Sequence, residues 1–156
     1  MTQATIPLEV RFKFLHPVWE EHGCEYSTEH SAGLDLRACL DEDSITVPAG
    51  GRAFVGAGVA IEISEPGWAG FVFSRSGLGA KDGLTVAQGV GVIDPDYRGE
   101  IKVCLLNTSG EPRVVTRGQR IAQLVFMPFR RAGVVACDDL SSTARGTGGF
   151  GHTGKL

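Results

Sequence analysis

Turns containing glycine or proline interrupt this chain roughly every 8–12 residues, so its regular elements have to be short. The 156 residues include 22 glycines and 7 prolines. Segments between the turns alternate hydrophobic with polar residues, as Val10–Phe14 does, which is typical of a strand with one buried face. The best helical candidate, at 74–83, is a single turn. We therefore predict an all-β sandwich or barrel.

Predicted strands cover much of the first 140 residues. The segment 16–31 is polar and irregular and is predicted to be a long surface loop. Residues 1–140 are expected to form one β core. Residues 141–156, rich in glycine, serine and threonine, are expected to form a flexible C-terminal arm. The predicted strands are 10–14, 45–48, 53–63, 68–73, 101–106, 113–116, 120–127 and 132–137.

The charge and the cysteines argue against several classes of protein. The net charge of −3 argues against non-specific nucleic-acid binding. No stretch approaches the roughly 20 apolar residues of a membrane helix, and residues 1–14 lack the apolar run of a secretory signal. The four scattered cysteines form no CxxC pair, so we expect reduced thiols in the cytoplasm. The spacing of His22, Cys24 and His30 matches no zinc pattern.

The segment 89–106 combines an acidic turn with the strand that follows it. Asp94 and Asp96 flank Pro95, and Tyr97 comes directly after them. A rigid turn that carries a carboxylate in a β framework is a suitable place for a general base. The same residue types also form ordinary hairpin turns, so this segment alone leaves both interpretations open.

The C-terminal arm formally matches two phosphate-binding motifs. Residues 146–151 fit G-x-G-x-x-G, and residues 149–155 fit the first seven positions of a Walker A loop. Both motifs normally open a helix that lends its N-terminal amides to the phosphates, and no helix is expected here. We expect instead an amide-rich arm, carrying Arg145 and Phe150, that closes over a phosphorylated ligand.

Five segments in this order resemble the motifs of the trimeric deoxyuridine triphosphatases, or dUTPases. They are SAGLDL at 31–36, SRSGLG at 74–79, GVGVIDPDYRGEI at 89–101, GQRIAQL at 118–124 and RGTGGFGHTG at 145–154. The resemblance implies a jelly-roll-like, distorted β-barrel and a homotrimer with active sites at the subunit interfaces. It also implies hydrolysis of dUTP to dUMP and pyrophosphate with Mg²⁺. Such a reaction supplies dUMP for dTMP synthesis and keeps uracil out of DNA.

The resemblance also implies roles for individual residues. Asp94 is expected to orient and activate the attacking water, with Asp96 as the rival base. Tyr97 is expected to lie against the deoxyribose, where its ring would exclude a 2′-hydroxyl. The backbone around Gly91 would meet the uracil edge. The residues expected to bind substrate in this region are Gln88, Gly91, Val92, Ile93, Tyr97 and Lys102.

The phosphates and the metal are expected to meet a second group of residues. By resemblance Asp35 holds water molecules of the Mg²⁺ ion in its outer shell. In the arm, Arg145 would bind the γ-phosphate and Phe150 would cover the uracil. Arg120 is left outside the site, because an interface ion pair would explain it equally well. The remaining phosphate-binding candidates are Arg75, Ser76, Gly77, Gln123, Gly151, His152 and Thr153.

Two alternatives remain beside dUTP hydrolysis. The Asp94-Pro95 pair resembles dCTP deaminases, which share the fold, but those enzymes need a glutamate where this chain has Cys104. They also generally lack the RGTGGFG arm. An inactive trimeric β protein that serves as a binding module is the other alternative. It is disfavoured because no motif position expected to do chemistry has been lost.

Overall fold

The computed structural model describes residues 8–149, which form eleven short strands and two short helical segments. The all-β class predicted from the sequence is confirmed. The helical segments are α1 (Val18–His22) and the π-helical η1 (Leu78–Asp82). The strands are β1 (Val10–Phe14), β2 (Leu34–Arg37), β3 (Ser44–Val47), β4 (Arg52–Gly56), β5 (Val59–Ile63), β6 (Trp68–Ser74), β7 (Leu84–Val86), β8 (Val90–Ile93), β9 (Lys102–Asn107), β10 (Arg113–Thr116) and β11 (Arg120–Pro128).

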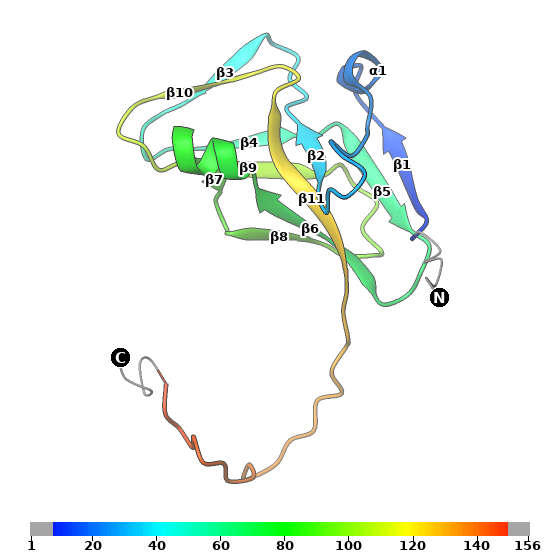
Figure 1. Ribbon diagram of the computed structural model, residues 1–156, viewed down its shortest axis with the longest axis vertical. Helices are drawn as coiled ribbons and strands as arrows, with labels where there is room; N and C mark the ends of the chain where they lie inside the picture. Colours follow the sequence, from blue (N-terminus) through cyan, green and yellow to red (C-terminus); the bar gives the residue numbers. More distant parts are fainter. Residues whose placement is uncertain (1–7, 150–156) are drawn as a thin grey trace.

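The strands form four small sheets in which every pair is antiparallel (Figure 1). The largest has the order β2-β11-β6-β8, and a second has the order β4-β9-β7. β1 pairs with β5, and β10 pairs with β3. The non-consecutive neighbours mean that the chain crosses between sheets, as it does in jelly-roll-like folds. None of the helices among residues 8–149 has the length and hydropathy needed to cross a bilayer.

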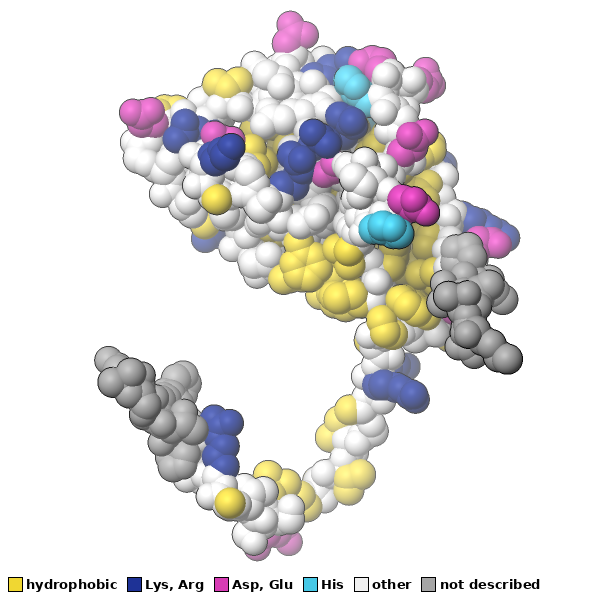
Figure 2. All heavy atoms as spheres, viewed as in Figure 1, with side chains coloured by type: hydrophobic (Ala, Val, Ile, Leu, Met, Phe, Trp, Pro, Cys, Tyr) yellow, Lys and Arg dark blue, Asp and Glu magenta, His cyan; other side chains and the backbone are white. Residues whose placement is uncertain are grey.

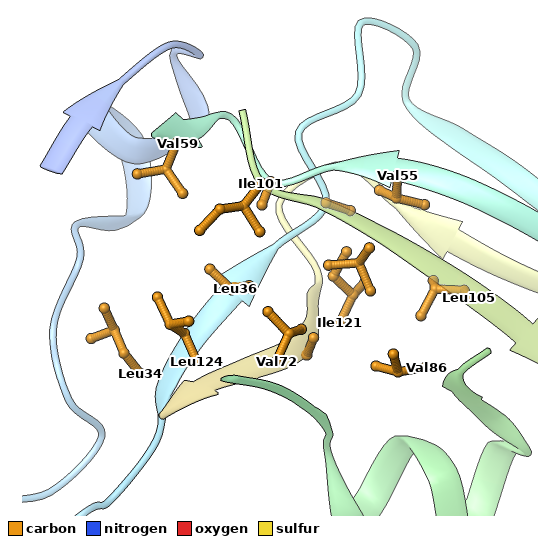
Figure 3. Packing of buried hydrophobic residues seen from close by; sticks show 14 of the residues in the cluster. Leu34, Leu36, Val55, Val59, Val72, Val86, Ile101, Leu105, Ile121 and Leu124 are labelled. Atoms are coloured by element: carbon orange, nitrogen blue, oxygen red, sulfur yellow. The ribbon is translucent and has the colours of Figure 1, made fainter. Parts of the chain in front are cut away.

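The core lies between the sheets and is made of aliphatic side chains. Figure 3 shows Leu36, Val72 and Ile121 pointing toward one another from three strands, together with Ile101, which directly precedes β9. All four are at most 3% exposed. Alternation along β2 buries Leu34 and Leu36 and leaves Asp35 and Arg37 partly exposed, which is how Asp35 becomes available at the site.

Part of the segment predicted to be a loop at 16–31 is helical, so that prediction is wrong for α1. Val18 and Trp19 are buried, and Trp19 Nε1 donates a hydrogen bond of 2.8 Å to the carbonyl oxygen of Ala57. Five residues are too few to show a helical period in the sequence. The helix exists because the tryptophan ring and its N–H both find partners in the core.

The long strand predicted at 53–63 is also wrong, because the structure divides it into β4 and β5. Gly58 has φ +58°, a left-handed conformation that suits glycine, and the chain turns there from one sheet into another. A Cβ at Gly58 would lie 2.6 Å from Cys39 Sγ. The run of small and β-branched residues at 53–63 gives no local signal that the chain passes from one sheet to another at Gly58.

The chain beyond β11 leaves the sheets and has no helix or strand through residue 149 (Figure 1). The strand predicted at 132–137 is therefore wrong. Its valines favour strands, but Val134 and Val135 are 95% and 85% exposed and pair with no strand among the described residues. The boundary between a core at 1–140 and an arm at 141–156 stays a prediction.

Candidate active site

β6 and its neighbours carry the two parts of the candidate site. Arg75 follows the C-terminal end of β6, while Asp94 follows β8, the antiparallel neighbour of β6. Gly70 pairs with Ile93, so Asp94 lies beside the N-terminal half of β6. The five residue-to-residue steps from Gly70 to Arg75 correspond to about 17 Å of strand. The two parts therefore lie at opposite ends of β6.

One part is a cleft of about 280 Å³, called here the Arg75 cleft. It joins the end of β6 to the centre of β2 and β11 and brings together every predicted phosphate and metal residue before the arm. Four of its lining residues are small and precede β2: two serines, an alanine and a glycine. The lining residues are Ser27, Ser31, Ala32, Gly33, Asp35, Arg75, Ser76, Gly77 and Gln123.

Asp35 is the centre of the ion pairs in the Arg75 cleft. Arg75 Nε lies 2.8 Å from Asp35 Oδ1, and Arg120 Nη1 lies 3.0 Å from Oδ2. Ser27 Oγ also donates to Oδ2, over 3.1 Å. The Asp35 side chain is 15% exposed, so these contacts are only partly screened by water. Sequence reasoning left Arg120 outside the site, and the structure puts it on the same carboxylate as Arg75.

Gln123 lies beside the phosphate-binding segment because β11 pairs with β6. Its Nε2 donates a hydrogen bond of 3.2 Å to the carbonyl oxygen of Ser74. Gly33 allows this position, since a Cβ there would lie 2.6 Å from Gln123 Oε1. Sequence reasoning did not assign a role to Gly33. Its place within the SAGLDL segment was the available signal.

The other part is a pocket of about 210 Å³, called here the Asp94 pocket. Tyr97 N donates to the carbonyl oxygen of Asp94 over 3.0 Å, which closes the turn. Tyr97 is 45% exposed and its hydroxyl donates to the carbonyl oxygen of Glu100 over 2.9 Å, so it is not a core aromatic residue. The lining residues are Val92, Ile93, Asp94, Tyr97, Glu100, Ile101 and Lys102.

Asp94 and Asp96 occupy different positions around this turn. Asp94 lines the Asp94 pocket and Asp96 does not. Both acids border a separate open hollow together with Arg98. Arg98 Nη1 donates to the carbonyl oxygens of Pro95 and Tyr97, over 2.6 and 3.2 Å. These contacts fix the turn, and sequence reasoning missed the role of Arg98.

The remaining predicted residues line neither pocket. Gln88 is exposed, and a Cβ on Gly91 would lie 3.4 Å from Gln88 Nε2 and 3.2 Å from Val72 Cβ. Gly91 therefore allows β8 to pass close to β6. Arg145 Nε donates to the carbonyl oxygen of Gly148 within the extended chain beyond β11. Phe150, Gly151, His152 and Thr153 lie outside the described residues.

The donor set fits a magnesium ion only in an indirect way. No group of three or more His, Cys, Asp or Glu side chains suited to a metal occurs among residues 8–149. Asp35 is the one carboxylate lining the Arg75 cleft, and an arginine lies on each of its oxygens. Mg²⁺ usually keeps several water ligands and binds through substrate phosphates with one or two carboxylates. Asp35 is therefore suited to accept hydrogen bonds from water molecules bound to the metal, and not to bind the metal directly.

Comparison with known proteins now decides the family. The sequence model described as dUTPase matches residues 20–154, which include all five motif segments. The chain belongs to the dUTPase family. A deoxyuridine 5′-triphosphate nucleotidohydrolase of Desulfitobacterium hafniense is 49% identical over 130 residues, covering 83% of this chain and 85% of the relative. One from Neisseria meningitidis serogroup B is 45% identical over 148 residues, covering 95% and 98%.

Solved dUTPase structures share the fold. The dUTPase of Staphylococcus bacteriophage 80alpha with dUPNHPP superposes with a TM-score of 0.78 at 23% identity, covering 94% of this chain and 98% of the other. A mutant dUTPase from phage phi11 of S. aureus coordinates a structural Mg(II) ion and superposes with a TM-score of 0.74 at 19% identity, covering 86% and 99%. The predicted jelly-roll-like architecture of the dUTPase type is thereby confirmed.

Proposed function

We propose that this chain hydrolyses dUTP to dUMP and pyrophosphate by attack of water on the α-phosphate. The observation that carries this proposal is the Arg75 cleft, in which Arg75, Gln123 and Asp35 converge in a member of the dUTPase family. A triphosphate needs this kind of site, because charge neutralisation and positioning provide most of the catalysis in phosphoryl transfer.

The Arg75 cleft would bind the phosphates through fixed donors. Asp35 engages Arg75 at Nε and the carbonyl oxygen of Arg120 accepts from Nη1, which leaves Nη2 of the guanidinium for phosphate oxygens. Ser76 offers a hydroxyl and Gly77 an amide with open space around it. The Gln123 side chain lies beside them and would add an amide donor. When bound, Mg²⁺ would neutralise further phosphate charge, and Asp35 would hold its water ligands.

The Asp94 pocket would supply the base and recognise the nucleoside. Asp94 is exposed and lies on a turn fixed by backbone hydrogen bonds, so its carboxylate can accept a proton from water without moving. It would also contact the 3′-hydroxyl. Tyr97 would lie against the sugar and exclude a 2′-hydroxyl. The backbone of β8 at Gly91, Val92 and Ile93 would meet the uracil edge, with Gln88 and Lys102 nearby.

The separation of the two pockets supports a homotrimer with active sites between subunits. The attacked phosphorus has to lie within about 3.5 Å of the water that Asp94 activates. Arg75 and Asp94 lie about 17 Å apart along β6, too far for one chain to place Asp94 at the α-phosphate and Arg75 on the β- and γ-phosphates next to it. A symmetric oligomer would bring the Arg75 cleft of one copy to the Asp94 pocket of another.

The arm would complete the site when substrate is bound. Arg145 would bind the γ-phosphate, Phe150 would cover the uracil, and the backbone or side chains of Gly151, His152 and Thr153 would donate to the phosphates. Closure of such a segment excludes water other than the nucleophile. Because the reaction controls nucleotide supply for DNA synthesis, we assign the chain to the cytoplasm.

A product assay tests this function against the alternatives. The protein is incubated with dUTP, dCTP or UTP in the presence of Mg²⁺, and the products are identified. Pyrophosphate from dUTP alone is expected. Ammonia from dCTP would favour a deaminase, although the buried Cys104 occupies the position where that activity needs glutamate. Absence of turnover with all three nucleotides would favour a binding module.

A further inference from the structure

A β-bulge in β11 turns Arg120 toward Asp35. Arg120 pairs with Arg37 of β2, whereas Ala122 pairs with Leu36, so two residues of β11 advance against one of β2. Gln123 then pairs with Asp35. In a regular strand, positions 120 and 123 would face opposite sides of the sheet, because side chains alternate. The bulge brings both to the Asp35 face, and bulges commonly re-aim side chains in this way near functional sites.

The consequence is one carboxylate shared between two arginines. Arg120 holds Asp35 Oδ2 at 3.0 Å, and Arg75 holds Oδ1 at 2.8 Å through Nε. Arg75 Nη1 also donates to the carbonyl oxygen of Arg120 over 3.4 Å. Figure 2 shows the Arg and Lys side chains gathered on the face over β2 and β11, with acidic side chains among them.

Arg120 decides how Asp35 can pair with Arg75. An arginine and a carboxylate with no other partner readily form two parallel hydrogen bonds. In such a pair, Asp35 would accept hydrogen bonds from both Nε and a terminal nitrogen of Arg75. That terminal nitrogen would then be unavailable to the phosphates. With Arg120 on Oδ2, Asp35 contacts only Nε among the ionic contacts of residues 8–149.

We propose that Arg120 is a positioning residue, which keeps Nη2 of Arg75 available to the substrate phosphates by occupying the second oxygen of Asp35. This role rests on the proposed dUTP hydrolysis. It predicts that Arg120 affects binding of the β- and γ-phosphates and has little effect on the nucleoside or the α-phosphate. Only one nitrogen of Arg120 contacts Asp35, so a lysine in its place would preserve much of the effect.

Calorimetric titrations with dUPNHPP and with dUMP test this proposal. Arg120→Ala should weaken dUPNHPP binding about tenfold, because Asp35 would then draw Arg75 away and a charge-assisted contact between Arg75 and a phosphate would be lost. Binding of dUMP should change less than about twofold, and Arg120→Lys should restore most of the dUPNHPP affinity. The matched control is Arg117→Ala, which removes an arginine that pairs with Glu21 at 2.8 Å in the turn before β11. This control should bind both ligands normally.

Three results separate the possible explanations. Equal weakening of dUPNHPP and dUMP by Arg120→Ala, or a loss in Arg117→Ala as large as that in Arg120→Ala, would overturn the positioning role. If Arg120→Ala and Arg117→Ala unfold at the same temperature, misfolding is excluded as the cause of a difference in their ligand affinities. If the wild-type protein binds dUPNHPP but releases no pyrophosphate from dUTP, hydrolysis is wrong, while the difference between the Arg120 and Arg117 variants still tests phosphate positioning.

Discussion

The Arg75 cleft and the Asp94 pocket lie at opposite ends of β6 and are built in different ways. Ion pairs hold Asp35 and Arg75 in the cleft, and a hydrogen bond from the Gln123 side-chain amide to the carbonyl oxygen of Ser74 holds Gln123. Backbone carbonyls hold the Asp94 pocket together, because they accept from Tyr97 N, the Tyr97 hydroxyl and Arg98. We therefore expect a preformed network to meet the substrate charge, whereas the proposed base, Asp94, is exposed on a rigid turn.

From this difference we expect the cleft to contribute mainly to binding of the triphosphate and the pocket mainly to the chemical step. A residue that binds the substrate and the transition state equally affects KM, and one that acts only in the transition state affects kcat. Substitutions in the two pockets should therefore have different kinetic signatures. The following experiments test that division in order of decreasing effect.

Asp94→Asn should have the largest effect on the chemical step. The amide cannot accept a proton from water, so kcat for dUTP should fall about 10²–10⁴-fold while affinity for dUPNHPP changes little. Steady-state kinetics and calorimetry measure the two quantities. Asp96→Asn is the matched control, because Asp96 belongs to the same turn but does not line the Asp94 pocket. If Asp96→Asn lost more activity than Asp94→Asn, the assignment of the base would be reversed.

Truncation after Leu140 should remove most of the activity and leave the fold intact. Leu140 is 88% exposed, and the described residues beyond it join no helix or strand, so little buried area is lost. Thermal unfolding should stay within about 2 °C of the full-length protein. Pyrophosphate release from dUTP should fall at least about tenfold, because both pockets would remain open to solvent. A large fall in the unfolding temperature would instead make these residues part of the core.

Gly33→Ala should weaken substrate binding and leave the chemical step nearly unchanged. The new Cβ would lie 2.6 Å from Gln123 Oε1 and 3.1 Å from Gln123 Cβ, so the amide side chain has to move. KM for dUTP should rise about tenfold, with kcat within about threefold of normal. Gly110→Ala is the control, since a Cβ there meets nothing within 4 Å. A fall in kcat without a rise in KM would contradict the division between the pockets.

Alkaline pH should destabilise the folded protein through the Cys39 thiol. Burial, reinforced by the charge of Glu100, raises the pKa of the Cys39 thiol from 9.0 to about 11. The unfolded thiol therefore ionises at lower pH than the folded one, and the stability that Cys39 contributes is lost as pH rises from about 9 to about 11. Denaturant unfolding at pH 8 and pH 10.5 should show a smaller loss in Cys39→Ala than in the wild type. Cys137→Ala, which alters an exposed thiol, should behave like the wild type.

The sequence predicted the strands and the chemistry better than the contacts between distant residues. Alternation identified β1, and the turns on either side identified β10, because both signals are local. The role of Arg120 could not be predicted in this way, since it depends on a bulge and on the pairing of β2 with β11. The break at Gly58 was hidden in a run of strand-forming residues, and the turn contacts of Arg98 follow from a side-chain conformation that no local pattern specifies.

A mixture of two inactive variants tests most directly whether the two ends of β6 meet between copies. Arg75→Ala and Asp94→Asn are co-expressed with different tags, and complexes that carry both tags are purified and assayed with dUTP. If each site takes its Arg75 cleft and its Asp94 pocket from neighbouring copies of a trimer, each complex that carries both tags has one intact site, roughly a third of its sites. We therefore predict that activity returns far above that of either variant alone. Activity no higher than the sum of the two separate variants would contradict the shared site.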